Sequence, residues 1–238
     1  MRVDIWAWAL TGDPARQSWF ASLLSADETQ RAGRFVRPRD RTHFVAARGR
    51  LREILSSYAG TAPEALRIDT TAKSKPVLTD GPAFNLSHSG GYAVLAVAPD
   101  HTETDLPLGI DIEAPRAVEP QLAELSFSAT EQAQIAAHSE PEWTNAFFRC
   151  WTRKEAVIKA LGTGLYTDLS SFDVTLRADD PVAVTRTGPD LPTPANWRLF
   201  HFDMGPGIPG ALACITTAQD IDINVCDAPD SVRPVFRF

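Results

Sequence analysis

The chain has 238 residues, 44% of them hydrophobic, which is enough for one large core or two small ones. Its formal net charge of −7 argues against general binding to nucleic acid or to a membrane surface. No apolar stretch approaches the roughly 20 residues that span a bilayer. The three scattered cysteines predict neither a disulfide framework nor a zinc site, so we expect reduced thiols in a cytoplasmic protein.

Charge is unevenly distributed along the chain. Residues 1–60 carry 10 Lys and Arg against 6 Asp and Glu, a net charge of +4, whereas the remainder carries 13 against 24, a net charge of −11. Opposite charges attract, so we expect an anionic ligand to contact the first part and a cation to be held by the second.

The first hundred residues predict a strand, two helices and a hairpin. Val, Ile and Trp over residues 3–9 favour a strand. Ser25 and Glu28 match a capping box at the start of a short helix that ends near residue 35. Apolar residues recur at helical spacing over 39–58, which predicts a second helix.

Arginines share one stripe of this second helix. Arg41, Arg48 and Arg52 are seven and four residues apart, so they lie on one side of it. Such a stripe is either a solvated face or a ridge that binds phosphate.

Residues 83–98, AFNLSHSGGYAVLAVA, predict a hairpin with its turn at Gly90-Gly91. In the hairpin, His88 lies between two serines at the end of the first strand. Hydroxyl, imidazole and amide donors in one place suit an anion site, although a lone histidine is more often structural. The polar, proline-bounded residues 99–107 then form the best candidate for a linker.

The second half predicts a strand, three helices and a group of strands. LGIDIE, residues 108–113, is the first strand, and Gly162 ends the last helix. The helices are expected at 119–125, 129–138 and 141–161. The later strands are expected at 171–176, 182–187, 196–202, 210–216 and 221–225.

Both halves therefore run from a strand through helices to further strands, although they share no visible sequence repeat. This order predicts the α+β class. We expect two similar α/β subdomains related by a pseudo-twofold axis, each an antiparallel sheet packed with helices. Their predicted ranges are 1–104 and 105–238.

Carboxylates in the strand LGIDIE form part of a candidate metal site. Asp111 and Glu113 project to one face because residues two apart in a strand share a face, while Ile110 and Ile112 point into the core. Adjacent carboxylates repel each other unless a cation compensates them. The alternative is a strand face that is merely solvated.

The helix over 141–161 adds Glu155 and Lys159, which stand four residues apart on one face. Alone, they predict an ordinary helix ion pair worth roughly 0.3 kcal/mol. Together with Asp111 and Glu113 they suit Mg²⁺ and a phosphate, because Mg²⁺ takes oxygen ligands and a lysine neutralises phosphate charge.

The motifs KP, FNLSHS, LGIDIE and WTRKEAVIK, in this order and spacing, resemble the 4′-phosphopantetheinyl transferase superfamily. The likeness covers roughly residues 73–165, and it is closest to the monomeric, two-lobed type that activates surfactin synthetase and other peptide and polyketide synthetases. The resemblance implies Mg²⁺-dependent transfer of 4′-phosphopantetheine from coenzyme A to a serine of an apo acyl or peptidyl carrier protein. The 3′,5′-ADP would leave, and the active site would lie between the subdomains.

The resemblance also implies roles for individual residues by motif position. The implied metal ligands are Asp111, Glu113 and Glu155, and the implied catalytic residues are Glu155, as general base, and Lys159. Coenzyme A would be bound by Arg48, Lys75, Ser87, His88 and Lys159, with His88 at the 3′-phosphate. One position departs from the family pattern, because Ser74 stands where Gly-Lys-Pro has glycine.

Two other functions stay open. A non-catalytic binder of coenzyme A or carrier proteins is disfavoured by the three intact carboxylates. A different Mg²⁺-dependent nucleotide phosphotransferase is disfavoured because no Walker-type loop is present. An apolar segment after LGIDIE is a candidate surface for carrier docking, or else part of the core. Its members are Pro115, Leu122, Leu125 and Phe127.

Overall fold

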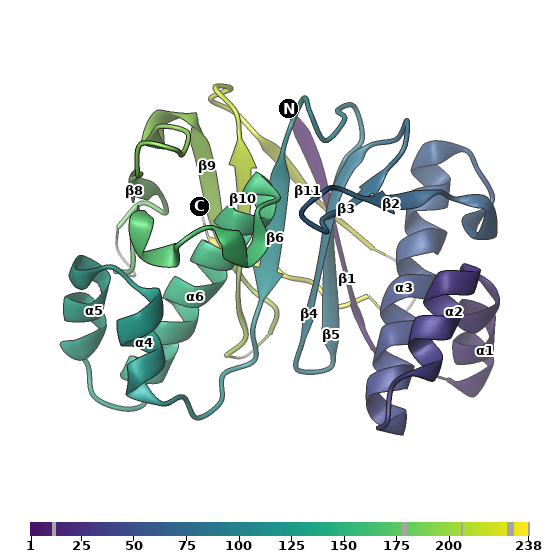
Figure 1. Cartoon of the computed structure of the whole chain (residues 1–238), viewed down its shortest axis with the longest axis horizontal. Coiled ribbons are helices and arrows are strands. Elements are labelled where there is room, and N and C mark those ends of the chain that lie inside the picture. The colour runs from purple at the N-terminus through teal and green to yellow at the C-terminus, as the bar shows by residue number, and fades with distance from the viewer. Residues whose placement is uncertain (11–12, 178–179, 206, 228–230, 238) are drawn as a thin grey trace.

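The computed structural model describes residues 1–10, 13–177, 180–205, 207–227 and 231–237, apart from the side chain of Leu165. Two four-stranded sheets stand at the centre, and a group of helices covers the outer side of each (Figure 1). The architecture is α+β in two lobes, as predicted.

The first lobe has the sheet order β11-β1-β5-β4. Its strands are β1 (Arg2–Ala9), β4 (Ala83–Ser89), β5 (Tyr92–Ala98) and β11 (Asp222–Cys226). Its helices are α1 (Pro14–Ser22), α2 (Ala26–Gly33) and α3 (Pro38–Ala59), and a small pair is formed by β2 (Ile68–Thr70) and β3 (Pro76–Leu78). The expectation of a wholly antiparallel sheet is wrong here, because β11 returns from the far end of the chain and pairs parallel to β1.

The second lobe has the antiparallel sheet order β12-β9-β10-β6. Its strands are β6 (Leu108–Ile112), β9 (Trp197–Asp203), β10 (Pro209–Ile215) and β12 (Val235–Arg237). Its helices are α4 (Pro120–Ser126), α5 (Ala129–Ala136) and α6 (Glu142–Leu161), and β7 (Asp173–Val174) pairs with β8 (Val184–Arg186). Since β11 joins the first sheet, the domain division at 104/105 stays a prediction.

Local signals placed most element ends correctly. Both hydrogen bonds of the predicted capping box join Ser25 and Glu28. Gly90 and Gly91 adopt φ 61° and 87° at the hairpin turn, and Gly162 adopts φ 65° at the end of α6. These positive φ values favour glycine because it has no Cβ to clash with the backbone. The strands β2, β3 and β12 and the helix α1 were not predicted.

Three apolar clusters fill the space between the layers. One lies between α1–α3 and the first sheet, and a second lies between α4–α6 and the second sheet. The third lies between the inner faces of the two sheets and includes Ile5, Ile110 and Leu212. The sheets therefore pack on each other, which holds the two lobes together.

Where β4 meets β6, side-chain oxygens of β4 accept the hydrogen bonds that backbone carbonyls would accept in a regular sheet. Asn85, Ser87 and Ser89 are alternate residues, so they share the face of β4 that looks toward β6. Each accepts a hydrogen bond from an alternate backbone amide. The pairs are Asn85 Oδ1 with Ile110 N (2.8 Å), Ser87 Oγ with Ile112 N (3.4 Å) and Ser89 Oγ with Ala114 N (3.0 Å). This side-chain ladder fixes the register of β6 against the first lobe.

Within the described part of the chain, none of the helices combines the length and apolarity that a membrane crossing requires.

Candidate active site

A hydrogen-bonded group joins the two lobes at the β4–β6 junction. Lys159 Nζ lies 2.6 Å from Asp111 Oδ1 and 3.1 Å from Ser87 Oγ, and it also donates to the carbonyl of Ile110. Ser87 Oγ donates to the same oxygen of Asp111 at 2.8 Å. Because α6, β6 and β4 each supply one of these side chains, the group exists only when the lobes are packed together.

Gly109 allows α6 to lie directly on β6 (Figure 1). A Cβ at this position would overlap the carbonyl oxygen of Ala156 and the nitrogen of Ala160, and would lie 2.8 Å from the carbonyl carbon of Lys159. The close approach brings Glu155 and Lys159 over the face of β6 that carries Asp111.

Glu113 is the second carboxylate on that face, since Ile110 and Ile112 point into the core between the sheets, as predicted. Its Oε2 accepts from Ser89 Oγ at 2.8 Å and from Arg116 Nη1 at 3.0 Å. The carboxylate is thus held by the last member of the β4 ladder and by an exposed arginine.

The three predicted carboxylates interact electrostatically. The pKa of Glu155 is raised to about 7, chiefly by burial and by the nearby Asp111, with a smaller contribution from Glu113 and with Lys159 opposing the rise. Burial also raises the pKa of Asp111, again against Lys159. A carboxylate with a pKa near neutrality can accept and release a proton at neutral pH, as acid–base chemistry requires.

The donor chemistry of this set fits a magnesium ion. Asp111, Glu113 and Glu155 offer only oxygen ligands, which Mg²⁺ prefers. Asp111 Oδ2 is buried and lacks a hydrogen-bond partner among the described residues. In the same part of the chain, no three His, Cys, Asp or Glu side chains already converge to hold an ion. Closing a site around an ion would therefore need rotation of the longer glutamate side chains.

Two histidines from the first lobe lie beside this group. Part of the His88 side chain reaches solvent, but desolvation of its ring, followed by the Lys159 charge, lowers its pKa, with a further contribution from His43. His43 was missed by the sequence analysis. Its Nε2 is buried without a hydrogen-bond partner in the described ranges. The sequence offered one indication of a role for His43, because this residue follows Arg39 by one helical turn in the arginine-rich helix.

Arg48 is engaged in an ion pair. Its Nη2 lies 2.6 Å from Glu28 Oε1, and Arg52 Nε lies 2.6 Å from the other oxygen of Glu28. Arg52 is buried and also donates to the carbonyls of Pro63 and Leu66. The arginine stripe thus ties α3 to α2, and a phosphate at Arg48 would have to compete with Glu28. The coenzyme contact at Arg48 stays a prediction.

Lys75 lies between β2 and β3 of the first lobe, and its side chain is buried against the first residue of β6. Its ammonium pairs with the carboxylate of Glu103 and donates to the carbonyl of Leu108 at 2.8 Å. These contacts give it a structural role, so its contact with coenzyme A stays a prediction. Ser74 adopts φ 68°, a conformation that favours glycine, which offers a conformational reason for the family's Gly-Lys-Pro.

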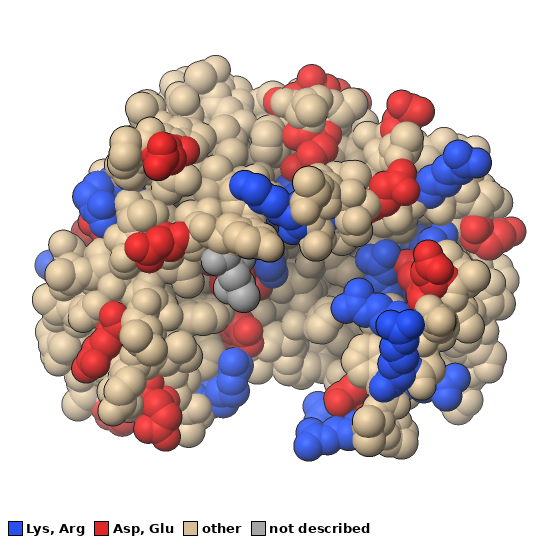
Figure 2. Space-filling model, in the orientation of Figure 1, with Lys and Arg blue, Asp and Glu red and all other residues tan. Residues whose placement is uncertain are grey.

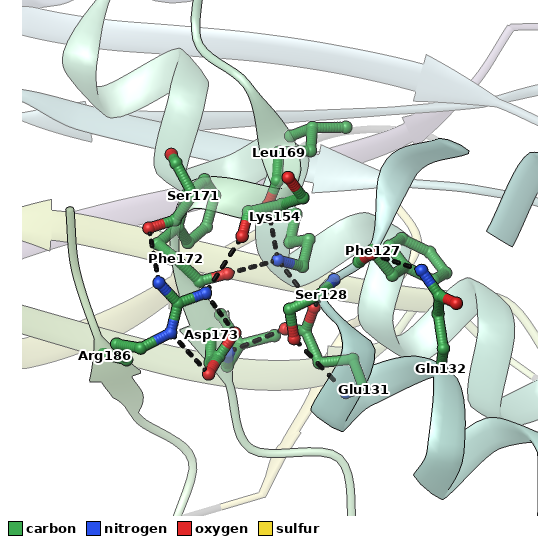
Figure 3. Close-up of polar contacts among 12 residues, drawn as sticks. Phe127, Ser128, Glu131, Gln132, Lys154, Leu169, Ser171, Phe172, Asp173 and Arg186 are labelled. Atoms are coloured by element: carbon green, nitrogen blue, oxygen red, sulfur yellow. Dashed lines mark hydrogen bonds and ion pairs between the residues drawn. The ribbon is translucent and has the colours of Figure 1, made fainter. Parts of the chain in front are cut away.

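Lys154, the residue before Glu155, anchors another side of α6, about 100° around the helix axis from Glu155, against α5 and the segment before β7 (Figure 3). It is fully buried, lies 2.7 Å from Glu131 Oε2 and donates to the carbonyls of Leu169 and Phe172. The adjacent Asp173 is held by Arg186. This network fixes the rotation of α6 and thereby the direction of Glu155.

The apolar segment proposed for carrier docking divides between surface and core. Leu125 is 80% exposed and Leu122 is 38% exposed, whereas Phe127 is 1% exposed. The ring of Phe127 packs at a tilt against Phe147 in the core of the second lobe, so Phe127 is part of the core, which was the alternative to a docking surface.

The view in Figure 2 shows a hollow between the two lobes. Lys and Arg side chains gather along the first-lobe edge of this hollow, which is the side that carries α2 and α3 in Figure 1. A basic edge facing a carboxylate cluster matches the charge division along the sequence. An anionic ligand and a cation could thus meet in this region.

Ser89 should affect metal affinity through Glu113. Replacing it with alanine removes a donor to Glu113 and an acceptor for Ala114 N, and hydrogen bonds to charged groups contribute about 2 kcal/mol. We expect Ser89→Ala to weaken Mn²⁺ binding roughly tenfold, measured by paramagnetic relaxation in the absence of other ligands. Ser89→Thr keeps the hydroxyl and should restore the affinity. Unchanged Mn²⁺ affinity in Ser89→Ala would exclude this role.

Comparison with known proteins gives matches over both lobes. Residues 107–217 match the model of the 4′-phosphopantetheinyl transferase superfamily, and residues 10–100 match the N-terminal 4′-phosphopantetheinyl transferase family. The 4′-phosphopantetheinyl transferase HetI of Nostoc sp. is 35% identical over 206 residues, which cover 84% of this chain and 81% of HetI. Sfp of Bacillus subtilis is 30% identical over 78% of this chain and 80% of Sfp. The human L-aminoadipate-semialdehyde dehydrogenase-phosphopantetheinyl transferase is 33% identical over 72% of this chain and 60% of its own length.

Proposed function

The chain belongs to the 4′-phosphopantetheinyl transferase superfamily, and from that premise we propose that Glu155, Lys159, Asp111, Glu113 and His88 form its active site. It is a transferase that moves phosphopantetheine from coenzyme A to a carrier protein. The observation that carries the site assignment is the contact of Lys159 with Asp111 and Ser87 across the lobe junction, beside a Glu155 of raised pKa.

In the proposed reaction, Glu155 accepts the proton of the carrier serine as its oxygen attacks the β-phosphorus of coenzyme A. A serine hydroxyl is a weak nucleophile at neutral pH, so a base at this position is required. The bond between the β-phosphorus and its bridging oxygen then breaks, and 3′,5′-ADP leaves. The raised pKa of Glu155 supports this role.

Lys159 would stabilise the negative charge that builds up on the pyrophosphate. Its ammonium is already positioned by Asp111 and Ser87, and a fixed cation stabilises a phosphoryl transition state without reorganisation. A magnesium ion held by Asp111, Glu113 and Glu155 would supply further positive charge to the same oxygens.

The first lobe would bind the phosphates at the other end of coenzyme A. His88 lies on β4 within electrostatic reach of Lys159, and His43 lies within electrostatic reach of His88 on α3. Burial lowers the pKa of each, which disfavours the protonated form while no anion is close. Approach of a phosphate would raise both pKa values and favour the protonated forms.

The test of the whole proposal is direct transfer. The protein is incubated with coenzyme A, Mg²⁺ and apo carriers from fatty-acid, polyketide and peptide synthesis, and each carrier is weighed by mass spectrometry. A gain of one phosphopantetheine group on at least one carrier supports an active enzyme, and the preferred carrier identifies the pathway. Carrier binding without any mass gain would favour the non-catalytic binder instead.

We also propose that the protein functions as a monomer in the cytoplasm. Light scattering measures the oligomeric state, and cell fractionation measures the location.

His88→Ala should weaken coenzyme A more than 3′-dephospho-coenzyme A. A lost charge-assisted hydrogen bond costs about 2 kcal/mol, so we expect roughly a tenfold or greater increase in Kd for coenzyme A only. Calorimetry with both ligands measures the difference. The matched control is His138→Ala, an exposed histidine that follows α5. Equal losses for the two ligands would remove His88 from the 3′-phosphate.

A further inference from the structure

Arg153 of α6 is a buried cation without a carboxylate partner in the described part of the chain. It is 2% exposed, and its Nη1 donates to the carbonyl and hydroxyl of Thr175. Its Nε is buried and has no hydrogen-bond partner among the described residues. Buried guanidinium groups are normally paired, because desolvating an unpaired charge costs several kcal/mol. Nε has no contact with solvent, so an anion in a neighbouring cavity would pair with the guanidinium through its remaining nitrogen, Nη2.

A cavity of about 330 Å³ lies against Arg153. Its polar and charged lining comes from α6, β9 and β12, and consists of Asn145, Arg149, Arg153, His201, Asp203 and Arg237. Asp203 is already matched, because Arg237 Nε and Nη2 donate to its Oδ2 at 3.0 and 2.7 Å. The remaining field in the cavity is therefore positive. Its volume is at the small end of ligand pockets, which favours a compact ion.

His201 supplies a second donor site in this cavity. It is 6% exposed, and its Nδ1 is buried with no hydrogen-bond partner within the described ranges. Burial and the Arg153 charge lower its pKa to about 4, so the ring is neutral at pH 7. Its Nε2 lies 3.6 Å from Asp203 Oδ1. A neutral imidazole carries one N–H, which can donate to an oxyanion once the ring turns that nitrogen toward the bound ion.

The cavity is separate from the proposed active site. Arg153 and Glu155 are two residues apart, so they point roughly 200° apart around the α6 axis. Glu155 and Lys159 face β6 and β4, whereas Arg153 faces Thr175 and His201 on the other flank.

We propose that this cavity binds a compact oxyanion, such as inorganic phosphate or a small dicarboxylate, between Arg153, Arg149 and His201. Guanidinium groups match oxyanions because their planar N–H groups donate in parallel to two oxygens. Arg149 already donates to Glu142 at 3.1 Å and to the carbonyl of Leu176 at the rim, which holds its guanidinium in place. The bound ion would tie α6 to β9 on the flank away from the catalytic residues.

The test follows the Nε–Hε resonance of Arg153 in ¹⁵N-labelled protein by NMR, assigned through its loss in Arg153→Lys. Phosphate is titrated at constant ionic strength with chloride as the balancing ion, and 3′,5′-ADP is present at saturation to occupy the active site. We expect a saturable shift of this resonance. A parallel titration with malonate distinguishes a phosphate site from a dicarboxylate site, because the ion that binds more tightly indicates the chemical class of the ligand. A shift that fails to saturate with either ion would overturn the proposal.

Two variants separate the cavity from general charge effects. Arg149→Gln should weaken phosphate about tenfold. Arg237→Gln, whose side chain is 68% exposed, should also weaken it because Asp203 is left without its partner. The matched control is Arg198→Gln on β9, whose guanidinium donates to the carbonyls of Ala195 and Trp197. Equal phosphate affinity in all three variants would overturn the assignment.

Discussion

Glu155→Gln should nearly abolish transfer of phosphopantetheine to carrier proteins while leaving coenzyme A binding largely intact. Glutamine keeps the size of the side chain but cannot accept a proton from the carrier serine. General bases contribute on the order of 10²–10⁴ in rate, so we expect a loss in kcat of that size. Transfer is measured by mass spectrometry of the carrier, and coenzyme A affinity is measured by calorimetry.

The dependence on Mg²⁺ separates the two roles proposed for Glu155. If the residue acts only as a metal ligand, high Mg²⁺ should restore the rate of Glu155→Gln. If it is also the base, the rate stays low at saturating Mg²⁺, which is the outcome we expect. Glu124→Gln on α4 replaces an exposed carboxylate and serves as the control. Near-normal turnover in Glu155→Gln would remove the residue from catalysis.

Gly109→Ala should cost both stability and activity. The added Cβ would meet the backbone of α6 at Ala156, Lys159 and Ala160, and backbone atoms cannot move aside by changing a rotamer. The helix would have to shift away from β6, and overpacking of this kind costs about 3 kcal/mol. The same shift would separate Lys159 from Asp111, so transfer should fall as well.

Urea denaturation and the transfer assay test this expectation together. The matched control is Gly33→Ala at the end of α2, where a Cβ would meet no heavy atom within 4 Å. This control should be neutral or slightly stabilising, because alanine has the higher helix propensity. Wild-type stability and turnover in Gly109→Ala would show that close packing of α6 on β6 is not needed.

The Lys159 side chain shows where local reasoning failed. Spacing alone favoured an i,i+4 ion pair with Glu155, a contact that the sequence can reveal because it stays within one helix. In the structure Lys159 donates to Asp111, Ser87 and Ile110, which come from two other strands. Buried carboxylates attract a cation more strongly than solvated ones, so the tertiary partner is preferred.

Arg48 and Lys75 also have partners that motif position did not predict. Both were assigned to coenzyme A by motif position, yet each is paired with a carboxylate of the chain, Glu28 and Glu103 respectively. Conversely, His43 enters the site only because α3 packs beside β4. Neither kind of contact has a fixed sequence spacing, so local periodicity does not reveal the partner.

Patterns within the sequence were enough to predict the secondary structure around the site, the α+β class and, through the family resemblance, the three carboxylates. These features depend on local periodicity, on glycine at positive φ and on motifs within single elements. The contacts between elements that are distant in sequence became visible only in the tertiary structure. They are the parallel pairing of β11 with β1, the side-chain ladder from β4 to β6 and the close packing of α6 on β6 at Gly109. It also raised the pKa of Glu155 to about 7. The physical reason is burial, because desolvation and the nearby Asp111 and Glu113 charges act only when strands and helices distant in sequence exclude water from the same place.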